Sequence, residues 1–178
     1  MTDGTLPEHF SRRVPTGDSM ERDVCDRCGF VAYRNPKVVT GSVVRHEGAI
    51  LLCRRAIEPR RGFWTLPAGY MELGETVEDA ARREAQEEAK ADVALERLLA
   101  VYSIPRIAQV QVMFLGSFAR PGFAAGPESL EVRLFPWDDI PWGDLAFPSV
   151  RWALTQARSV EGQAAFVPFT NPPGERGD

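Results

Sequence analysis

A short helix with an alanine-lined face is the feature that most constrains the fold of this chain. The stretch TVED at residues 76–79 has the pattern of a capping box, which begins a helix at a hydroxyl residue followed three positions later by an acidic one. Small or aliphatic residues then recur at helical spacing on one side: Val77, Ala80, Ala81 and Ala85. A face this narrow can press closely on a sheet.

Aliphatic and β-branched runs around this helix predict the strands of that sheet. We expect a hairpin of strands at 38–45 and 49–54, split by the turn His46-Glu47-Gly48. Further strands are predicted at 93–103, 110–118 and 130–137, and a second helix at 147–160 begins near a proline. Residues 58–69 and 119–129 are predicted loops. Hairpins mixed with two separate helices indicate an α/β fold, a mixed sheet with helices on both faces.

The length and the ends of the chain suggest its domain organisation. A chain of 178 residues suits one compact domain with a small appendage. We expect a polar N-terminal segment at 1–34, the main domain at 35–166 and a disordered tail at 167–178.

Composition excludes several classes of protein. A hydrophobic fraction of 44% with 26% charged residues is ordinary for a soluble globular domain, and a net charge of −4 gives no reason to expect capture of nucleic acid or of an anionic membrane. The first residues lack the pattern of a secretory signal, and no apolar run is long enough to span a bilayer. Three cysteines argue against a disulfide framework, so a cytoplasmic location is expected.

Three carboxylates crowd the end of the predicted helix where the dipole disfavours them. Glu84, Glu87 and Glu88 stand at i, i+3 and i+4 and share one face. A hard divalent cation would offset this cost, because Mg²⁺ takes oxygen ligands and is often shared with substrate phosphates. Glu72 and Glu75 can join the cluster if the preceding loop folds back. The alternative for this fragment alone is a solvated helix face laced with ion pairs.

The wider pattern resembles the Nudix box, the sequence motif of the Nudix hydrolases. The motif G-x5-E-x7-R-E-U-x-E-E-x-G-U is matched at six spaced positions: Gly69, Glu75, Arg83, Glu84, Glu87 and Glu88. The stretch FWTLPAGYMELGE also looks like the sequence that usually leads into the box in this family. The resemblance implies a Nudix α/β/α sandwich. Lys90 and Ala91 depart from the motif's final glycine and apolar residue, so we expect a shifted helix end and retained activity.

The resemblance also implies roles for the matched residues. Glu84, Glu87 and Glu88 would bind Mg²⁺ or Mn²⁺, with the Gly69 carbonyl and Glu75 assisting. Arg83 would orient the glutamates, and Glu84, Glu87 and Arg83 count as catalytic. The implied reaction is attack of water on a diphosphate linkage.

Members of this family often place a further glutamate on a loop or strand far from the box. The stretch GPESLEVRLF resembles a pattern found downstream of the box in several Nudix subfamilies. We favour Glu128 as a metal ligand or general base, with Glu131 as the second choice. The alternative is that both are surface residues on a short strand.

The N-terminal segment resembles the zinc ribbon that precedes the Nudix domain in a subset of Nudix enzymes. That subset includes NADH pyrophosphatases and a plant-type group acting on FAD and ADP-ribose, and residues 24–147 look most like the plant-type group. The stretch VYSIPRIAQVQVMF lacks the pattern that NADH pyrophosphatases carry after the box, while Pro105 favours ADP-ribose.

The resemblance to a zinc ribbon is incomplete in its metal ligands. A ribbon needs four ligands, yet only Cys25 and Cys28 form a C-x2-C pair. His9 is a possible third ligand, and Cys53 is expected in the core. The favoured interpretation is a degenerate ribbon that has lost its zinc.

Arginine and aromatic side chains outside the box could contact a nucleotide. Arg54, Tyr102, Arg106 and Phe147 are candidates to line the base and phosphate pockets, since aromatic rings stack and arginine pairs with phosphate. Arg55 could face phosphate or solvent, and Trp64 is expected to pack.

These inferences predict a Mg²⁺- or Mn²⁺-dependent pyrophosphatase acting on FAD, ADP-ribose or a related dinucleotide. Two alternatives stay open: a hydrolase of damaged nucleoside triphosphates, and a non-catalytic module that senses nucleotide sugars. The expected partners are a nucleotide substrate and a second copy in a homodimer, with no nucleic acid or membrane.

Overall fold

The computed structural model describes residues 7–177 and divides into two compact units at the junction of Asn35 and Pro36. The smaller unit is an antiparallel sheet in the order β1-β2-β3, formed by β1 (Phe10–Arg13), β2 (Arg22–Cys25) and β3 (Val31–Ala32). Within residues 7–35, the buried residues are Asp23 and Val24. Ion pairs connect the strands and turns of this unit, with Arg13 at 2.8 Å from Asp26 and Arg34 at 2.6 Å from Asp23.

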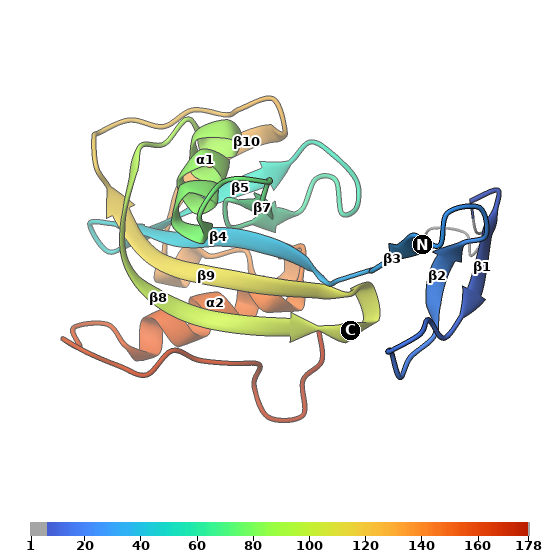
Figure 1. Ribbon diagram of the computed structural model, residues 1–178. Helices are drawn as coiled ribbons and strands as arrows, with labels where there is room; N and C mark the ends of the chain where they lie inside the picture. Colours follow the sequence, from blue (N-terminus) through green and yellow to red (C-terminus); the bar gives the residue numbers. More distant parts are fainter. Residues whose placement is uncertain (1–6, 178) are drawn as a thin grey trace. The chain divides into compact units, whose positions relative to one another are not determined.

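The larger unit is built on one mixed sheet, visible at the centre of Figure 1. Its main path runs β10-β5-β4-β9-β8, with β7 paired to β4 and β6 to β5. The strands are β4 (Lys37–His46), β5 (Ala49–Arg55), β6 (Trp64–Thr65), β7 (Ala68–Tyr70), β8 (Val93–Ile104), β9 (Gln109–Phe118) and β10 (Ser129–Pro136). The pair β4 and β9 is parallel and the other pairs are antiparallel. This confirms the predicted mixed sheet.

Two helices cover opposite faces of this sheet (Figure 1). They are α1 (Val77–Ala89) and α2 (Pro148–Ser159). Short 3-10 turns lie at Pro105–Ile107, Trp137–Asp139 and Trp142–Asp144. The α/β class and the ribbon-like N-terminal sheet are therefore as the sequence predicts. No helix in residues 7–177 is long and apolar enough to cross a membrane.

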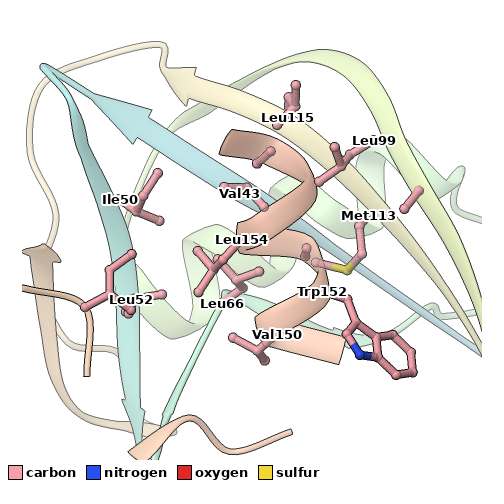
Figure 2. Close-up of a cluster of buried hydrophobic side chains, with 14 of the residues drawn as sticks. Val43, Ile50, Leu52, Leu66, Leu99, Met113, Leu115, Val150, Trp152 and Leu154 are labelled. Atoms are coloured by element: carbon pink, nitrogen blue, oxygen red, sulfur yellow. The ribbon is translucent and has the colours of Figure 1, made fainter. Parts of the chain in front are cut away.

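Alternate residues along the central strands enter two separate cores. Val43 and Leu52 lie in the core beneath α2, where Figure 2 shows them with Leu154. Their neighbours Val44 and Leu51 lie in a smaller core with Ala85 of α1. This alternation follows from the two-residue period of a β-strand. The residues of β5 that follow Leu52 therefore continue to alternate between the α1 side and the α2 side of the sheet.

The helix α1 begins and ends at identifiable caps. The Thr76 hydroxyl accepts a hydrogen bond from the Asp79 backbone N–H at 3.1 Å, as the capping box predicts. At the other end Lys90 takes the left-handed conformation with φ 51° and donates its backbone N–H to the carbonyls of Ala85 and Gln86. The expected shift of the helix end is wrong, because lysine adopts the backbone conformation that the motif's glycine would supply, at a cost of about 1 kcal/mol.

Two segments predicted to be irregular contribute to the sheet. The predicted loop at 58–69 contains β6 and β7, which are too short for a periodic pattern to reveal. The predicted tail runs beside β8: the Phe169 N–H donates to the Leu99 carbonyl at 2.8 Å, and the Val101 N–H donates to Phe169 at 3.0 Å. The Asn171 side chain adds hydrogen bonds to both backbone groups of Ser103.

Candidate active site

The glutamates of α1 gather on the side of the helix that meets the sheet. Glu84 and Glu88 are only 8% and 5% exposed, whereas the Glu87 side chain is 56% exposed. Buried carboxylates are rare in proteins unless they are paired or bind a metal. The three side chains thus form a cluster that runs from the buried face of α1 to solvent.

Arg83 connects this cluster to the loop before the helix. Its guanidinium donates to both carboxylate oxygens of Glu75, at 3.0 and 2.9 Å. It also donates to Glu84 at 2.8 Å, to Glu87 at 2.9 Å and to the Tyr70 carbonyl at 2.8 Å. The hydrogen bonds from Arg83 lower the pKa of Glu75. Arg83 thereby fixes the orientation of three carboxylates at once.

The strand β7 approaches α1 so closely that only glycine fits at its centre. A Cβ atom at Gly69 would lie 2.3 Å from a Glu84 carboxylate oxygen. The neighbouring Ala68 backbone N–H donates to Glu88 at 3.0 Å. The glycine is therefore required for room, since Glu84 fills the space that a side chain would take.

The electrostatics of the cluster show that it suits a cation. Burial first of all, with the charges of Glu84 and Glu128, raises the pKa of Glu88 to about 8, against the hydrogen bond from Ala68. Burial also raises the pKa of Glu84, although Arg83 opposes this. Oxygen donors that crowd and repel one another are the set that a hard divalent cation prefers. The oxygen donors are of the type that Mg²⁺ or Mn²⁺ takes, but in residues 7–177, where Arg83 holds Glu84 and Glu87, no three of these side chains converge on a common point.

The two glutamates outside the helix have different surroundings. The charge of Glu128 contributes to the raised pKa of both Glu84 and Glu88, so its carboxylate lies near them. Glu131 lies on β10, 3.8 Å from the guanidinium of Arg54. The structure brings Glu128 to the cluster and leaves Glu131 beside Arg54.

The loop that carries Glu128 is fastened to the end of α1. The Gly126 N–H donates to the Glu88 carbonyl at 3.0 Å, and the Ala124 N–H donates to the Ala89 carbonyl at 2.8 Å. Terminal helix carbonyls need such partners. The same contacts hold Glu128 close to the helix that bears the other glutamates.

The predicted nucleotide contacts divide into residues near the cluster and residues away from it. Tyr102 is fully buried, packs against Trp152 and donates its hydroxyl to Gln156, so it belongs to the α2 core. Arg54 donates to the Gly62 carbonyl at 3.0 Å. Arg106 lies in the 3-10 turn after β8. Tyr102 and Arg54 thus have their partners elsewhere than at the glutamates of α1.

Arg55, for which the sequence left phosphate and solvent open, is the arginine of β5 on the side of the cluster. Its charge lowers the pKa of Glu88, and its guanidinium lies 5.3 Å from the centre of the Phe147 ring. The Pro59 carbonyl accepts a hydrogen bond from it at 2.8 Å. The strand period could have shown this, because Arg55 shares the parity of Leu51 and Cys53, which face α1.

The N-terminal cysteines do not complete a zinc site within one chain. Cys25 is half-buried and Cys28 is exposed. Residues 7–177 contain no group of three or more histidine, cysteine, aspartate or glutamate side chains arranged to hold a metal ion. The His9 ring lies 3.4 Å from Glu8. The donor set of one chain therefore does not fit the four-ligand requirement of structural zinc.

Comparison with known families identifies the family to which the chain belongs. The profile of the NUDIX domain matches residues 35–154, and that of the Nudix N-terminal zinc ribbon matches residues 8–34. The chain belongs to the Nudix hydrolase family, whose members use divalent metals such as Mg²⁺ or Mn²⁺.

Individual relatives agree with this assignment. A NUDIX hydrolase of Nitrosomonas europaea has a structure with a TM-score of 0.84 and 44% identity, covering 91% of this chain and 93% of that one. An ADP-ribose pyrophosphatase of Methanocaldococcus jannaschii is 32% identical over 61% of this chain and 67% of its own length. A NAD-capped RNA hydrolase NudC of Salmonella heidelberg is 32% identical, but the match spans 66% of this chain and 46% of that protein.

Proposed function

We propose that this protein hydrolyses the diphosphate bond of a nucleoside diphosphate linked to another group, with ADP-ribose or FAD as substrate. The observation that carries the proposal is the complete cluster of Glu84, Glu87 and Glu88, held by Arg83. A module that only senses a nucleotide would have no need of this full set of carboxylates.

Glu84, Glu87 and Glu88, with the Gly69 carbonyl, are the groups that would hold Mg²⁺ or Mn²⁺. When bound, such an ion neutralises phosphate charge and lowers the pKa of coordinated water. Arg83 and Glu75 keep the glutamates in place by charge-assisted hydrogen bonds. Their task is orientation, because neither need contact the substrate.

We assign the proton transfer to Glu128. Hydrolysis forms a bond between a water oxygen and one phosphorus and breaks the bond from that phosphorus to the bridging oxygen. The attacking water loses a proton, which a carboxylate near the metal ligands can accept. ADP-ribose would yield AMP and ribose 5-phosphate, and FAD would yield AMP and FMN.

Arg55 and Phe147 are the residues that we assign to substrate binding. The Arg55 guanidinium is oriented by the Pro59 carbonyl and by the Phe147 ring, and it lies close enough to Glu88 to affect its pKa. An arginine at the edge of a carboxylate cluster can pair with a phosphate that the cluster also holds through metal.

Three further observations bear on the choice of substrate. The archaeal relative is an ADP-ribose pyrophosphatase, which favours ADP-ribose. The resemblance of residues 24–147 to the plant-type group favours FAD. A human 8-oxo-dGDP phosphatase, NUDT18, is 34% identical over 58% of this chain and 33% of its own length, so a damaged nucleotide is the second candidate substrate.

The test is a substrate panel with Mg²⁺ or Mn²⁺, read by the identity of the products. The panel contains ADP-ribose, FAD, NADH, NAD-capped RNA, 8-oxo-dGDP and nucleoside triphosphates. We expect AMP with ribose 5-phosphate or FMN, and a loss of at least about 100-fold in kcat for Glu87→Gln. Glu78→Gln is the matched control, because it makes the same change in the first turn of α1. Equal rates for the wild type and Glu87→Gln would overturn the proposal.

A further inference from the structure

Thr40 of β4 has a hydroxyl group without a partner in the interior of the larger unit. Its side chain is fully buried, and its Oγ1 atom forms no hydrogen bond within residues 7–177. A buried hydroxyl of this kind is unfavourable, because it gives up its hydrogen bonds to water and gains none in return. Such atoms are uncommon in native structures. A donor in this position could serve a group that moves toward it.

The Thr40 side chain lies on the face of the sheet that carries the glutamates. Thr40 is four residues before Val44, which packs with Ala85 of α1, and residues an even number apart on a strand share a face. Across the ladder the partner of Thr40 is Gly69 of β7. The Cβ atoms of directly opposite residues lie about 4.5–5.5 Å apart. The nearest cross-strand neighbour of Thr40 is therefore whatever occupies the Cβ position of Gly69.

The carboxylate of Glu84 occupies that position. A Cβ atom at Gly69 would lie 2.3 Å from Oε2 of Glu84 and 2.5 Å from Oε1. Oε1 accepts the hydrogen bond from Arg83 at 2.8 Å. The Glu84 carboxylate is thus held by Arg83 and lies across the ladder from Thr40, although no hydrogen bond joins it to the Thr40 hydroxyl in this orientation.

Ser42, two residues farther along β4, provides a contrast. Its hydroxyl is also fully buried, has no partner in the part of the chain that the structure describes, and lies on the same face. The Ser42 backbone N–H donates to the Pro67 carbonyl at 3.1 Å, so its neighbour across the ladder is the buried Pro67 ring. A proline ring offers a hydroxyl no hydrogen bond, whereas Glu84 offers Thr40 a carboxylate oxygen.

We propose that Thr40 is a positioning residue for Glu84, whose carboxylate accepts a hydrogen bond from the Thr40 hydroxyl when it turns from Arg83 toward a cation. The inference rests on the proposed function. Among the described side chains, those of the cluster do not converge on a common point while Arg83 holds Glu84, so Glu84 must turn before it can share a cation with Glu88. A buried carboxylate that leaves one donor needs another, and Thr40 supplies it from the sheet.

Two exchanges of Thr40 separate this role from packing. Thr40→Val replaces the hydroxyl by a methyl group of similar size, and Thr40→Ser keeps the hydroxyl but removes a methyl group. In a chelator we expect the urea midpoint of Thr40→Val to lie at or above that of the wild type, because a partnerless hydroxyl is removed. The midpoint of Thr40→Ser should be lower, because a cavity is left. Binding of Mn²⁺, measured by electron paramagnetic resonance, should show the reverse order: about 10-fold weaker in Thr40→Val and close to the wild type in Thr40→Ser.

Ser42→Ala is the matched control, and hydrolysis gives a second reading. This variant removes the other partnerless hydroxyl of β4 and should leave Mn²⁺ binding and kcat unchanged. In Thr40→Val, kcat should fall about 10-fold, and Thr40→Ser should restore most of it. Unchanged Mn²⁺ binding in Thr40→Val, or an equal loss in Thr40→Ser or Ser42→Ala, would show that Thr40 does not position Glu84. Because Mn²⁺ binding needs no substrate, a wild-type protein that binds Mn²⁺ but cleaves no diphosphate would instead refute the proposed function.

Discussion

At the scale of single residues, Glu128 and Glu131 lie three positions apart in the sequence but have different surroundings. Glu128 ends the loop that is bound to α1, and its charge acts on Glu84 and Glu88. Glu131 lies in the following strand beside Arg54. The sequence pattern offers both residues as the base, and only the path of the backbone distinguishes them.

Neutralising these two glutamates should therefore have unequal effects on hydrolysis. We expect Glu128→Gln to lower kcat by about 100-fold, within the range for loss of a general base or of a ligand to an essential metal. Glu131→Gln should leave kcat essentially unchanged, because the residue is an exposed partner of Arg54. Steady-state kinetics on the preferred substrate measure both effects. An equal or larger loss for Glu131→Gln would reverse the assignment.

Glu88 should make the metal-free protein less stable as the pH rises. Its pKa is raised from 4.5 to about 8 in the folded state, so between these values the native chain retains a proton that the unfolded chain has lost. Linkage then lowers the free energy of unfolding with rising pH. The loss amounts to a few kcal/mol at most, since one pKa unit corresponds to about 1.4 kcal/mol.

Urea unfolding in a chelator at pH 5 and pH 8 measures this effect. Glu88→Gln should flatten the decline, because glutamine stays neutral at both values, whereas Glu78→Gln should follow the wild type. If the free energy of unfolding changed by the same amount between pH 5 and pH 8 in the wild type and in Glu88→Gln, the raised pKa of Glu88 would be refuted.

At the scale of elements, α1 depends on a segment far from it in the sequence. Its first residue, its cap and its alanine face follow from local sequence rules. Its last carbonyls are bound by Ala124 and Gly126, and no local rule could predict this, since a helix end can be satisfied by water, by a side chain or by any nearby loop. Gly126 marks the contact: a Cβ atom there would lie 1.7 Å from the Glu87 carbonyl oxygen.

Gly126→Ala should therefore loosen the loop from α1. We expect a loss of about 1–3 kcal/mol in the free energy of unfolding, as for other overpacked contacts, and a lower kcat because Glu128 follows two residues later. Denaturant unfolding and steady-state kinetics measure the two effects. Gly143→Ala is the matched control, since nothing lies within 4 Å of a Cβ atom at that position. Equal stability of the two variants would contradict the close contact.

At the scale of the whole molecule, the sequence predicts the elements better than their partners. Strand periodicity and turn residues give most of the strand positions, but they do not show that β4 pairs in parallel with β9, about seventy residues away. The same limit explains Tyr102, whose ring belongs to the α2 core because its strand faces that side. The carboxylates of α1 were predictable because helical spacing alone places them together, whereas Arg55 needed the face of β5 to be known.

The C-terminal segment contributes to the larger unit through Phe169. Phe169 joins the edge of the sheet through β8 and packs against the α2 core, stacked with Phe166. We expect Phe169→Ala to lower the free energy of unfolding by about 1–3 kcal/mol, less than for a fully buried phenylalanine because the ring is half-buried. Val167→Ala should have no measurable effect, since Val167 is 84% exposed. Unfolding midpoints in urea compare the two variants. If Phe169→Ala unfolded like Val167→Ala, packing of the Phe169 ring against the α2 core would contribute nothing to stability, and the hydrogen bonds to Leu99, Val101 and Ser103 would alone hold this segment to β8.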